Sequence, residues 1–492
     1  MRVEEARADY MATLVDNQGW PEIAIEEIAD VNPRVDKASI PDDLPVSFVP
    51  MPAVGAADGT IHVEETRPAS KVKKGFTAFL EGDVLFAKIT PCMENGKMAV
   101  VPALVNGYGF GSTEFHVLRP KPGMDAKYLY YYVSSQSFRR EAERHMTGAV
   151  GQRRVPTTYL KECKIPVAPL DQQKRIVAEI EKQFSRLDEA VANLKRVKAN
   201  LKRYKAAVLK AAVEGRLVET EAELARREGR SYETGGRLLQ RILETRRSQW
   251  QGKGKYKEPA APDTTNLPEL PEGWVWVSAS ALLREPLRNG HSAKATNNPN
   301  GLRAFTLSAV TVGNFSEENT KLTVAEPSKV EDLWAMPGDI YVERSNTPEL
   351  VGTTCLYNGP VKFAFIPDLL IRIRVCELVL PRFVELALQS DFGRRYFKDR
   401  AQGISGTMPK IDQAAIETYA ISLPPQAEQH RIVAEVDRRL SLLRETETQV
   451  DADLQRAERL RHSILEGAFS GRIVHIGDSA VSTVTGQLLV SV

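Results

Sequence analysis

The sequence predicts an α+β protein with two related mixed α/β domains, separated by two long antiparallel, coiled-coil-like helices in a pseudo-two-fold internal repeat. Three observations predict this fold. A long stretch of the chain recurs at a constant distance, each copy begins with short strands and turns, and each copy continues into a long segment without glycine or proline. A chain of 492 residues has room for two or three domains that each bury a core.

The internal repeat is visible in matching motifs. QQKRIVAEI at residues 172–180 returns as EQHRIVAEV at residues 428–436, so Arg175 corresponds to Arg431, a shift of 256 residues (431 less 175). Between such anchors the register slips by one or two residues, as loop insertions would produce. Further matches at this shift are Gly82-Asp83 with Gly338-Asp339, Lys88 with Arg344, Gly96 with Gly352, and GRLV at 215–218 with GRIV at 471–474. A constant shift over this length indicates a duplicated architecture.

Strand and turn patterns predict two globular domains of one kind, at residues 20–168 and 272–423. In the first, DVLFAKI and KMAVV are strand-like, and DIYVE and TTCLY are their counterparts in the second. The remaining boundaries are a leader at 1–19, a central helical spacer region at 169–250, a linker at 251–271, a distal helical spacer region at 424–474 and a flexible tail at 475–492. Within the central region, residues 217–250 are expected to continue as a charged helical stretch.

The two segments without glycine or proline, 171–214 and 426–466, carry heptad repeats. The apolar positions are Ile180, Leu187, Leu194, Leu201 and Val208, with Phe184 and Val191 between them, and Val436, Leu443, Val450, Ala457 and Ile464, with Leu440 and Leu454 between them. This spacing places apolar side chains on one narrow stripe of each helix, which is typical of helices that pair.

Catalytic and metal-binding motifs are missing from the sequence. There is no Walker A loop, no H-E-x-x-H and no Asn/Asp-Pro-Pro-aromatic motif of an amino-methyltransferase, and the glycines of GYGFG at 107–111 suggest turns rather than a nucleotide loop. The four cysteines are scattered singly, which argues against a disulfide framework or a zinc knuckle. The first twenty residues do not resemble a signal peptide, and no apolar run would span a bilayer, so a cytoplasmic protein is expected.

Bulk charge does not indicate a nucleic-acid partner, because the formal net charge is only +2. The distribution of charge is more informative. Eight basic residues and one acid, Glu214, lie between Lys195 and Arg216. Such a run is either a solvated helix face or a surface that contacts phosphates or a partner protein.

Two polar loops occupy matching positions in the two halves. The first loop is residues 88–97, matched by 344–352, and the second loop is residues 147–154, matched by 402–410. Basic side chains, hydroxyls and amides on loops held by strands are the groups that contact the edges of DNA bases and the phosphates. The candidate DNA-binding residues are Lys88, Thr90, Asn95, Lys97, Gln152, Arg153 and Arg154 in the first half, and Arg344, Asn346, Thr347, Ser405, Thr407 and Lys410 in the second.

These motifs resemble those of the specificity subunits of type I restriction-modification systems, over nearly the whole chain. The resemblance rests on GDVLFAKITPCMENGK (82–97), LDQQKRIVAEIE (170–181), LKRYKAAVLKAAVEGRLV (201–218), ETGGRLLQRILETRR (233–247), LPEGWVW (270–276) and RSNTPELVG (344–352). It implies that residues 20–168 and 272–423 are target recognition domains, each recognising one half of a bipartite site in double-stranded DNA. Lys88 and Arg344 are the leading candidates for DNA contact.

The resemblance also implies partners. The helices would set the gap between the half-sites and dock two methylation subunits, which would methylate adenine N6 with S-adenosylmethionine, and a restriction and translocase subunit would use ATP and Mg²⁺. The chain itself would be non-catalytic, without cofactor or metal. The partner-binding positions expected on the helices are Ile180, Phe184, Leu187, Leu194, Leu201, Val436, Leu440, Leu443 and Val450. The rival interpretations are a fragment of a single-chain restriction-methylation enzyme, which the missing methyltransferase motifs disfavour, and a structural coiled-coil scaffold.

Overall fold

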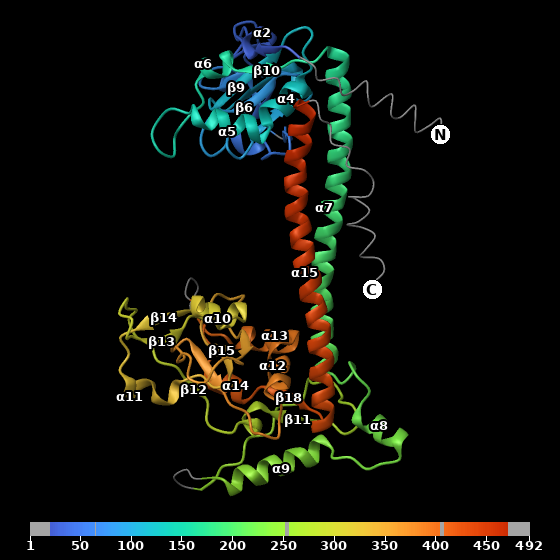
Figure 1. Ribbon diagram of the computed structural model, residues 1–492, viewed down its shortest axis with the longest axis vertical. Coiled ribbons are helices and arrows are strands. Elements are labelled where there is room, and N and C mark those ends of the chain that lie inside the picture. Colours follow the sequence, from blue (N-terminus) through green and yellow to red (C-terminus); the bar gives the residue numbers. More distant parts are fainter. Residues whose placement is uncertain (1–19, 64, 251–254, 404–407, 471–492) are drawn as a thin grey trace. The chain divides into compact units, whose positions relative to one another are not determined.

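The computed structural model describes residues 20–63, 65–250, 255–403 and 408–470 (Figure 1). The chain divides into two compact units: unit 1 is built from residues up to 196 and from 449 onward, and unit 2 from residues 197–448. Two 44-residue helices, α7 (Leu170–Val213) and α15 (Gln426–Phe469), each contribute one part to each unit. Both ends of α15 lie 256 residues after those of α7, so the repeat that the sequence predicts is confirmed at these helices.

Unit 1 contains a mixed α/β domain with two four-stranded sheets. The central sheet has the order β2-β9-β6-β7 and is antiparallel, and the outer sheet has the order β4-β3-β8-β5, in which β3 and β8 are parallel. A short antiparallel pair joins β1 to β10, and β10 directly precedes α7 in the chain. The elements are β1 (Glu22–Ala24), α2 (Ile25–Ile28), β2 (Ala29–Val31), β3 (Pro45–Val49), η1 (Met51–Ala53), β4 (Glu65–Pro68), α3 (Ala69–Val72), β5 (Thr77–Leu80), β6 (Val84–Ala87), β7 (Met98–Val100), η2 (Val105–Gly107), β8 (Tyr108–Gly111), β9 (Phe115–Pro120), α4 (Ala126–Ser134), α5 (Gln136–Arg144), α6 (Thr157–Glu162) and β10 (Lys164–Pro166).

Unit 2 repeats the central sheet with the order β12-β17-β15-β16 and the short pair as β11 with β18, but its outer sheet has two strands, β13 and β14. The elements are α8 (Glu221–Glu228), α9 (Gly235–Ser248), β11 (Val275–Ser278), η3 (Ala279–Leu282), β12 (Arg288–Asn289), β13 (Leu302–Phe305), α10 (Leu307–Val312), η4 (Glu317–Asn319), β14 (Thr320–Thr323), α11 (Pro327–Val330), η5 (Glu331–Leu333), β15 (Ile340–Glu343), β16 (Thr354–Leu356), β17 (Leu370–Ile373), α12 (Pro381–Gln389), α13 (Asp391–Arg400), α14 (Gln413–Glu417) and β18 (Ala420–Leu423). Two related domains and two long helices confirm the predicted fold class.

The central sheets are buried on both faces because their strands alternate between two cores. In unit 1, Val84 and Phe86 of β6 belong to the core that includes α4, while Leu85 faces the core of the outer sheet. In unit 2, Ile340 of β15 faces α12, and Tyr341 faces an aromatic cluster around Phe305. The YLYYY run at residues 128–132 lies in helix α4, and its Tyr128 and Tyr130 are buried in the unit 1 core that includes this helix.

The glycine-rich run at 107–111 departs from the sequence expectation. Gly107 has a positive φ of 77° and ends the short 3-10 helix η2, whereas Gly109 and Gly111 lie in strand β8, between β3 and β5. A Cβ at Gly109 would collide with the ring of Phe79 on β5. These two glycines therefore allow a close packing contact rather than a turn.

The apolar stripe of the long helices is buried within the chain. In unit 1, Leu187 of α7 shares a core with Ala457 and Ile464 of α15, and in unit 2 Val208 of α7 shares a core with Val436 and Leu440 of α15. The N-terminal part of each helix thus packs with the C-terminal part of the other, which is the predicted antiparallel pairing.

The same burial corrects the assignment of these positions to a partner protein. The side chains that are at most 8% exposed are Ile180, Leu187, Leu194, Val436, Leu440, Leu443 and Val450. Phe184 and Leu201 are half-buried against the two cores. Because these stripe residues contact one another and the adjacent domain, a partner would have to bind other faces of the helices.

A buried glutamine fastens the start of each long helix to its domain. In unit 1, Gln173 donates from Nε2 to the carbonyl of Ala168 at 2.7 Å and accepts at Oε1 from the amide of Asp125 at 2.8 Å. In unit 2, Gln429 donates to Pro424 at 3.2 Å and accepts from Leu380 at 3.0 Å. Both side chains are 0% exposed, so the repeated motif around them encodes a helix-to-domain joint.

The region after α7 is not one continuous charged helix, which corrects that expectation. The chain turns at Gly215, where φ is +68°, and then forms α8 and α9 separately. A capping box between Thr220 and Glu223 begins α8. Among the described residues, no helix has the length and apolar character needed to cross a membrane.

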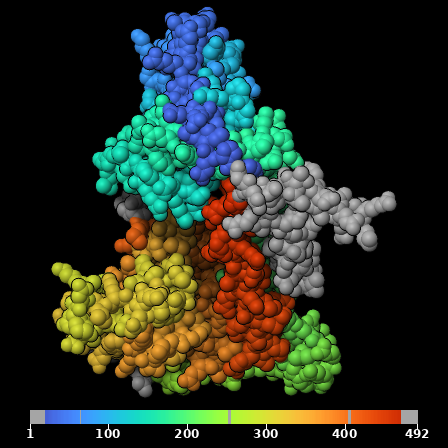
Figure 2. Space-filling model, turned by 45° about the horizontal axis from the view of Figure 1, so that its top comes forward, coloured from blue at the N-terminus to red at the C-terminus, as the bar shows by residue number. Residues whose placement is uncertain are grey.

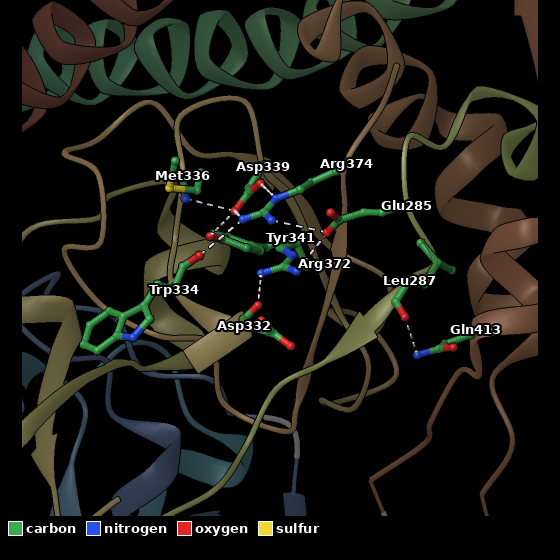
Figure 3. A network of polar contacts seen from close by, with 10 residues as sticks. All are labelled: Glu285, Leu287, Asp332, Trp334, Met336, Asp339, Tyr341, Arg372, Arg374 and Gln413. Carbon is green, nitrogen blue, oxygen red and sulfur yellow. Dashed lines mark hydrogen bonds and ion pairs between the residues drawn. The ribbon is translucent and has the colours of Figure 1, made fainter. Parts of the chain in front are cut away.

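A buried aspartate–arginine pair fixes the turn that leads into the same central strand in both units. In unit 1, Asp83 binds Arg119 through two hydrogen bonds of 2.8 Å and also accepts the amide of Leu80. In unit 2, Asp339 binds Arg374 at 2.5 and 3.0 Å (Figure 3). The pair joins strand β6 to β9, and β15 to the end of β17, through a two-pronged contact that lysine could not make.

We predict that Asp83→Ala lowers the free energy of unfolding of unit 1 by about 3 kcal/mol, because it leaves Arg119 partly buried without its carboxylate. The matched control is Asp42→Ala, since Asp42 binds Lys73 at 2.7 Å but its side chain is 78% exposed. This control should cost less than about 1 kcal/mol. Denaturant titration of the purified protein measures both values, and equal losses in the two variants would contradict the prediction.

Candidate nucleic-acid interface

The candidate surface lies at one end of the central sheet in each unit. In unit 1, β6 ends at Ala87 opposite Phe115, where β9 begins, and β2 ends nearby at Val31 opposite Leu118. Because neighbouring antiparallel strands run in opposite directions, β2 and β6, on either side of β9, end at the same edge. The chain leaves this edge through Lys88, the first residue of the first loop. Unit 2 repeats the arrangement with β12, β17 and β15.

Backbone hydrogen bonds join the first and second loops into one surface. In unit 1, the amide of Val155 donates to the carbonyl of Lys88 at 2.9 Å, and the amide of Thr90 donates to the carbonyl of Arg153 at 3.0 Å. In unit 2, the amide of Ile411 donates to the carbonyl of Arg344, also at 2.9 Å. The bond from Val155 to Lys88 returns as the bond from Ile411 to Arg344 with both residues shifted by 256, so the loop junction itself is duplicated.

An arginine on the following helix holds the first loop in each unit. Arg139 of α5 donates to the carbonyl of Glu94, and Arg394 of α13 donates to the carbonyls of Glu349 and Val351 at 2.8 and 3.1 Å. Burial lowers the pKa of both guanidinium groups. These two arginines were not identified from the sequence, since nothing in the helix pattern shows that they reach back to a loop.

Lys88 is the basic residue of unit 1 that remains most available at the sheet edge. It is half-buried, and among the described residues its side chain forms no ion pair. Arg154 instead binds Glu114 at 2.8 and 2.9 Å, and the hydrogen bonds and charge of Arg154 hold the pKa of Glu114 below its usual value. Arg153 lies 3.8 Å from Glu94 and 3.6 Å from Glu143.

The other predicted residues of unit 1 divide into exposed and internally bonded groups. Asn95 and Gln152 are exposed, whereas Thr90 donates to Glu94 at 3.1 Å. Lys97 donates from Nζ to the carbonyls of Met51 and Val54 at 3.1 and 2.9 Å. Lys97 therefore contributes to holding the outer sheet segment near η1, and its ammonium group faces the protein.

In unit 2, Arg344 is half-buried at the sheet edge, while Thr347 and Lys410 are exposed. Asn346 is only 8% exposed and donates to Glu343 at 2.6 Å, so its amide is engaged inside the domain. Burial raises the pKa of the Glu343 carboxyl, which also accepts a hydrogen bond from Thr311. Ser405 and Thr407 lie outside the described residues.

The edge strands β2 and β12 of the two central sheets add residues that the sequence did not single out. Asn32 follows β2, adopts φ +56°, and bonds through its side chain to His116 at 3.1 Å. Asn289, at the end of β12, accepts from Gln413 Nε2 at 3.0 Å. Only the pairing of the strands places these residues beside the loops. Within the described part of the chain, no group of three or more His, Cys, Asp or Glu side chains could hold a metal ion.

Comparisons with known proteins agree with this architecture. Residues 17–203 match the family described as the type I restriction modification DNA specificity domain. The chain is 26% identical over 471 residues to the type I restriction enzyme EcoEI specificity subunit of Escherichia coli, covering 85% of this chain and 77% of the relative. It is 28% identical over 481 residues to the EcoAI specificity subunit of the same species, with the same coverage.

Two solved structures have a similar fold. A chain from a study of complex assembly and conformational transition of the type I R-M system aligns with a TM-score of 0.63 at 20% identity, covering 92% of this chain and 98% of that one. The HsdS subunit from Thermoanaerobacter tengcongensis aligns with a TM-score of 0.50 at 21% identity, covering 93% and 98%.

The comparisons confirm the resemblance found in the sequence, and the relatives are named as specificity subunits, in agreement with a subunit that has no catalytic site. Residues 17–203 match the type I restriction modification DNA specificity domain, and over most of its length the chain is similar to specificity subunits of type I restriction enzymes.

Proposed function

We propose that this chain is the DNA sequence-specificity subunit of a cytoplasmic type I restriction-modification complex. The domain of unit 1 recognises one half of a bipartite site in double-stranded DNA, and the domain of unit 2 recognises the other half. The observation that carries this proposal is the duplicated sheet edge. Lys88 and Arg344 hold the same place in the two domains, and the second loop is bonded to each of them in the same way.

The chemistry at this edge suits DNA. A lysine or arginine at a fixed backbone position can bind a phosphate or the O6 and N7 atoms of guanine in the major groove. Because Arg154 is bound to Glu114, it supports the loop in the free protein and would need to exchange partners to contact DNA. Lys88, Arg344 and Lys410 need no such exchange among the described residues.

The long helices fix the gap between half-sites and dock the methylation subunits. The methylation subunits supply S-adenosylmethionine and methylate adenine N6 on an extruded base, and restriction subunits supply the ATP-dependent, Mg²⁺-dependent steps. The docking surface lies on outward faces of the helices, since their apolar stripes are internal. Lys195, Arg196, Lys202 and Arg203 of α7 are exposed and are available to a partner or to phosphates.

We predict that Arg344→Ala lowers methylation of the bipartite site by roughly tenfold to a hundredfold in the complex with its methylation subunits, because a bidentate base contact contributes about 1–3 kcal/mol. Arg344→Lys should restore only part of the activity if the contact is bidentate. Arg237→Ala, on the exposed face of α9, is the matched control. Undiminished methylation by Arg344→Ala would remove this residue from the interface.

We predict that one heptad inserted into α7 after Arg196 and one into α15 after Thr448 lengthens the preferred gap by about 3 base pairs. Seven helical residues add about 10 Å, and stacked base pairs are about 3.4 Å apart. Methylation of a series of duplexes with different gaps measures the preference. An insertion into α7 alone should instead destabilise the protein, because it breaks the register of the buried stripe. An unchanged preferred gap in the double insertion would refute the spacer role.

A further inference from the structure

We propose that residues 288–301 of unit 2, the arm, are a third DNA-contacting element that binds backbone phosphates beside the second half-site through Arg288 and Lys294. The inference rests on the proposed function and extends it, because neither of the two duplicated loops includes this segment. It also makes the two units unequal: unit 2 neutralises more phosphates than unit 1 through this part of its surface.

The arm leaves the sheet at the same edge as Arg344. Asn289 of β12 pairs with Ile371 of β17, which pairs on its other side with Val342 of β15. His291 and Arg344 each lie two residues after the aligned residues Asn289 and Val342. Their backbones are therefore level with each other and two strand spacings apart, which is roughly 10 Å. The major groove is about 12 Å wide, so both segments can contact one turn of DNA, Arg344 toward the groove and the arm toward its flanking strand.

The connector from Ile366 to Leu370 binds both segments. It accepts the amide of Arg344 at the carbonyl of Leu369 (2.8 Å), and it accepts the amides of Gly290 and His291 at Leu370 (3.2 Å) and Ile366 (3.0 Å). A Cβ at Gly290 would collide with the carbonyl oxygens of Ile366 and Pro367. Only glycine lets the arm lie this close to the connector that also carries Arg344.

The arm is also fastened to the elements around it. Gln413, which begins α14 three residues after Lys410, donates to the carbonyl of Leu287 at 3.4 Å (Figure 3). It also donates to the side chain of Asn289. Further along, the amide of Thr296 donates to Leu322 at 2.9 Å, and the amide of Val324 donates to Lys294 at 3.0 Å. An element held by backbone contacts at both ends loses little conformational entropy when it binds.

Its surface is cationic and polar. Arg288, Lys294 and the amides of Asn297, Asn298 and Asn300 are exposed. The sequence from Pro286 to Ser316 contains no aspartate or glutamate. The nearest preceding acid, Glu285, is bound to Arg372 at 2.9 Å and to Arg374 at 3.3 Å (Figure 3). One carboxylate does contact the arm, since Asp368 accepts a hydrogen bond from the hydroxyl of Ser292, so the two cations of the arm outnumber this acid by one. In Figure 2 the yellow part of the chain, which includes the arm, forms an outer surface of its domain.

The corresponding segment of unit 1 does not offer this charge. After Asn32, the exposed Arg34 is followed by Asp36, and the ammonium group of Lys37 donates to the carbonyls of Lys73 and Phe76 at 3.0 Å each. Lys37 of this segment is thus bonded within the domain, and the charge of Arg34 is balanced by that of Asp36. The contrast indicates that the arm of unit 2 has gained a role beyond that of connecting two strands.

The test uses the complex of the full chain with its methylation subunits and the double variant Arg288→Gln/Lys294→Gln. The dissociation constant is measured across a series of salt concentrations on a duplex with both half-sites and on one with a scrambled second half-site. Each lost phosphate contact lowers the slope of log affinity against log salt by about 0.9, so the slope should fall by about 2 on both duplexes. The matched control is Lys362→Gln, an exposed lysine of the same unit outside the arm.

Two results would overturn the proposed role of the arm, and a third would overturn the proposed function itself. An unchanged salt slope in the double variant, with the thermal unfolding of the protein unaltered, overturns the arm as a phosphate-binding element. A changed base preference in the second half-site with an unchanged slope also overturns it, because the arm would then contact bases. If the wild-type complex itself does not distinguish the intact duplex from the scrambled one, the proposed function fails, whatever the slope.

Discussion

The antiparallel pairing of β6 with β9, and of β15 with β17, is the constraint on which both candidate interfaces depend. A ladder of this kind makes one strand end where its neighbour begins, so segments from distant parts of the sequence meet at one edge. The buried pairs Asp83–Arg119 and Asp339–Arg374 fix the other end of the same strands. The first loop, the second loop and the segment after the edge strand can then vary in sequence while their starting points stay fixed.

Much of this frame was predictable because the repeat preserves it. The constant shift of 256 residues located both long helices and the central strands that precede Lys88 and Arg344, and heptad spacing predicted which helix faces pair. Side chains that act through distant contacts could not be predicted. Lysine and asparagine are residue types that often contact DNA, but in the folded chain Lys97 donates to Val54 and Asn346 donates to Glu343. Only the fold brings these partners together.

The two domains diverge most where the central sheet faces its outer layer. Tyr341 and Arg372 pair across β15 and β17, and Leu85 and Val117 pair at the corresponding place in β6 and β9. The polar pair of unit 2 is incorporated into a network with Glu285 and Asp339 (Figure 3). An apolar and a polar residue pair thus support the same strand geometry. In unit 2 the two terminal nitrogens of Arg372 are bonded to Asp332 and Glu285, whereas its Nε is buried without a hydrogen-bond partner among the described residues. Sequence comparison of the halves alone would hide this equivalence.

The tryptophan near the start of each domain shows that the repeats have become specialised. Trp20 donates to Gln172 at 3.2 Å in unit 1, while Trp274 donates to Glu428 at 3.0 Å in unit 2. The carboxylate has a second oxygen, and it accepts the first amide of α8, from Glu221, at 2.8 Å. If the second half were a copy of the first, glutamine would replace Glu428 and would place an amide nitrogen where the second oxygen lies. The buried amide of Glu221 would then lose its acceptor, which costs about 1–3 kcal/mol of stability. At this joint the halves therefore differ by the second carboxylate oxygen of Glu428, and they cannot be exchanged here without a loss of stability.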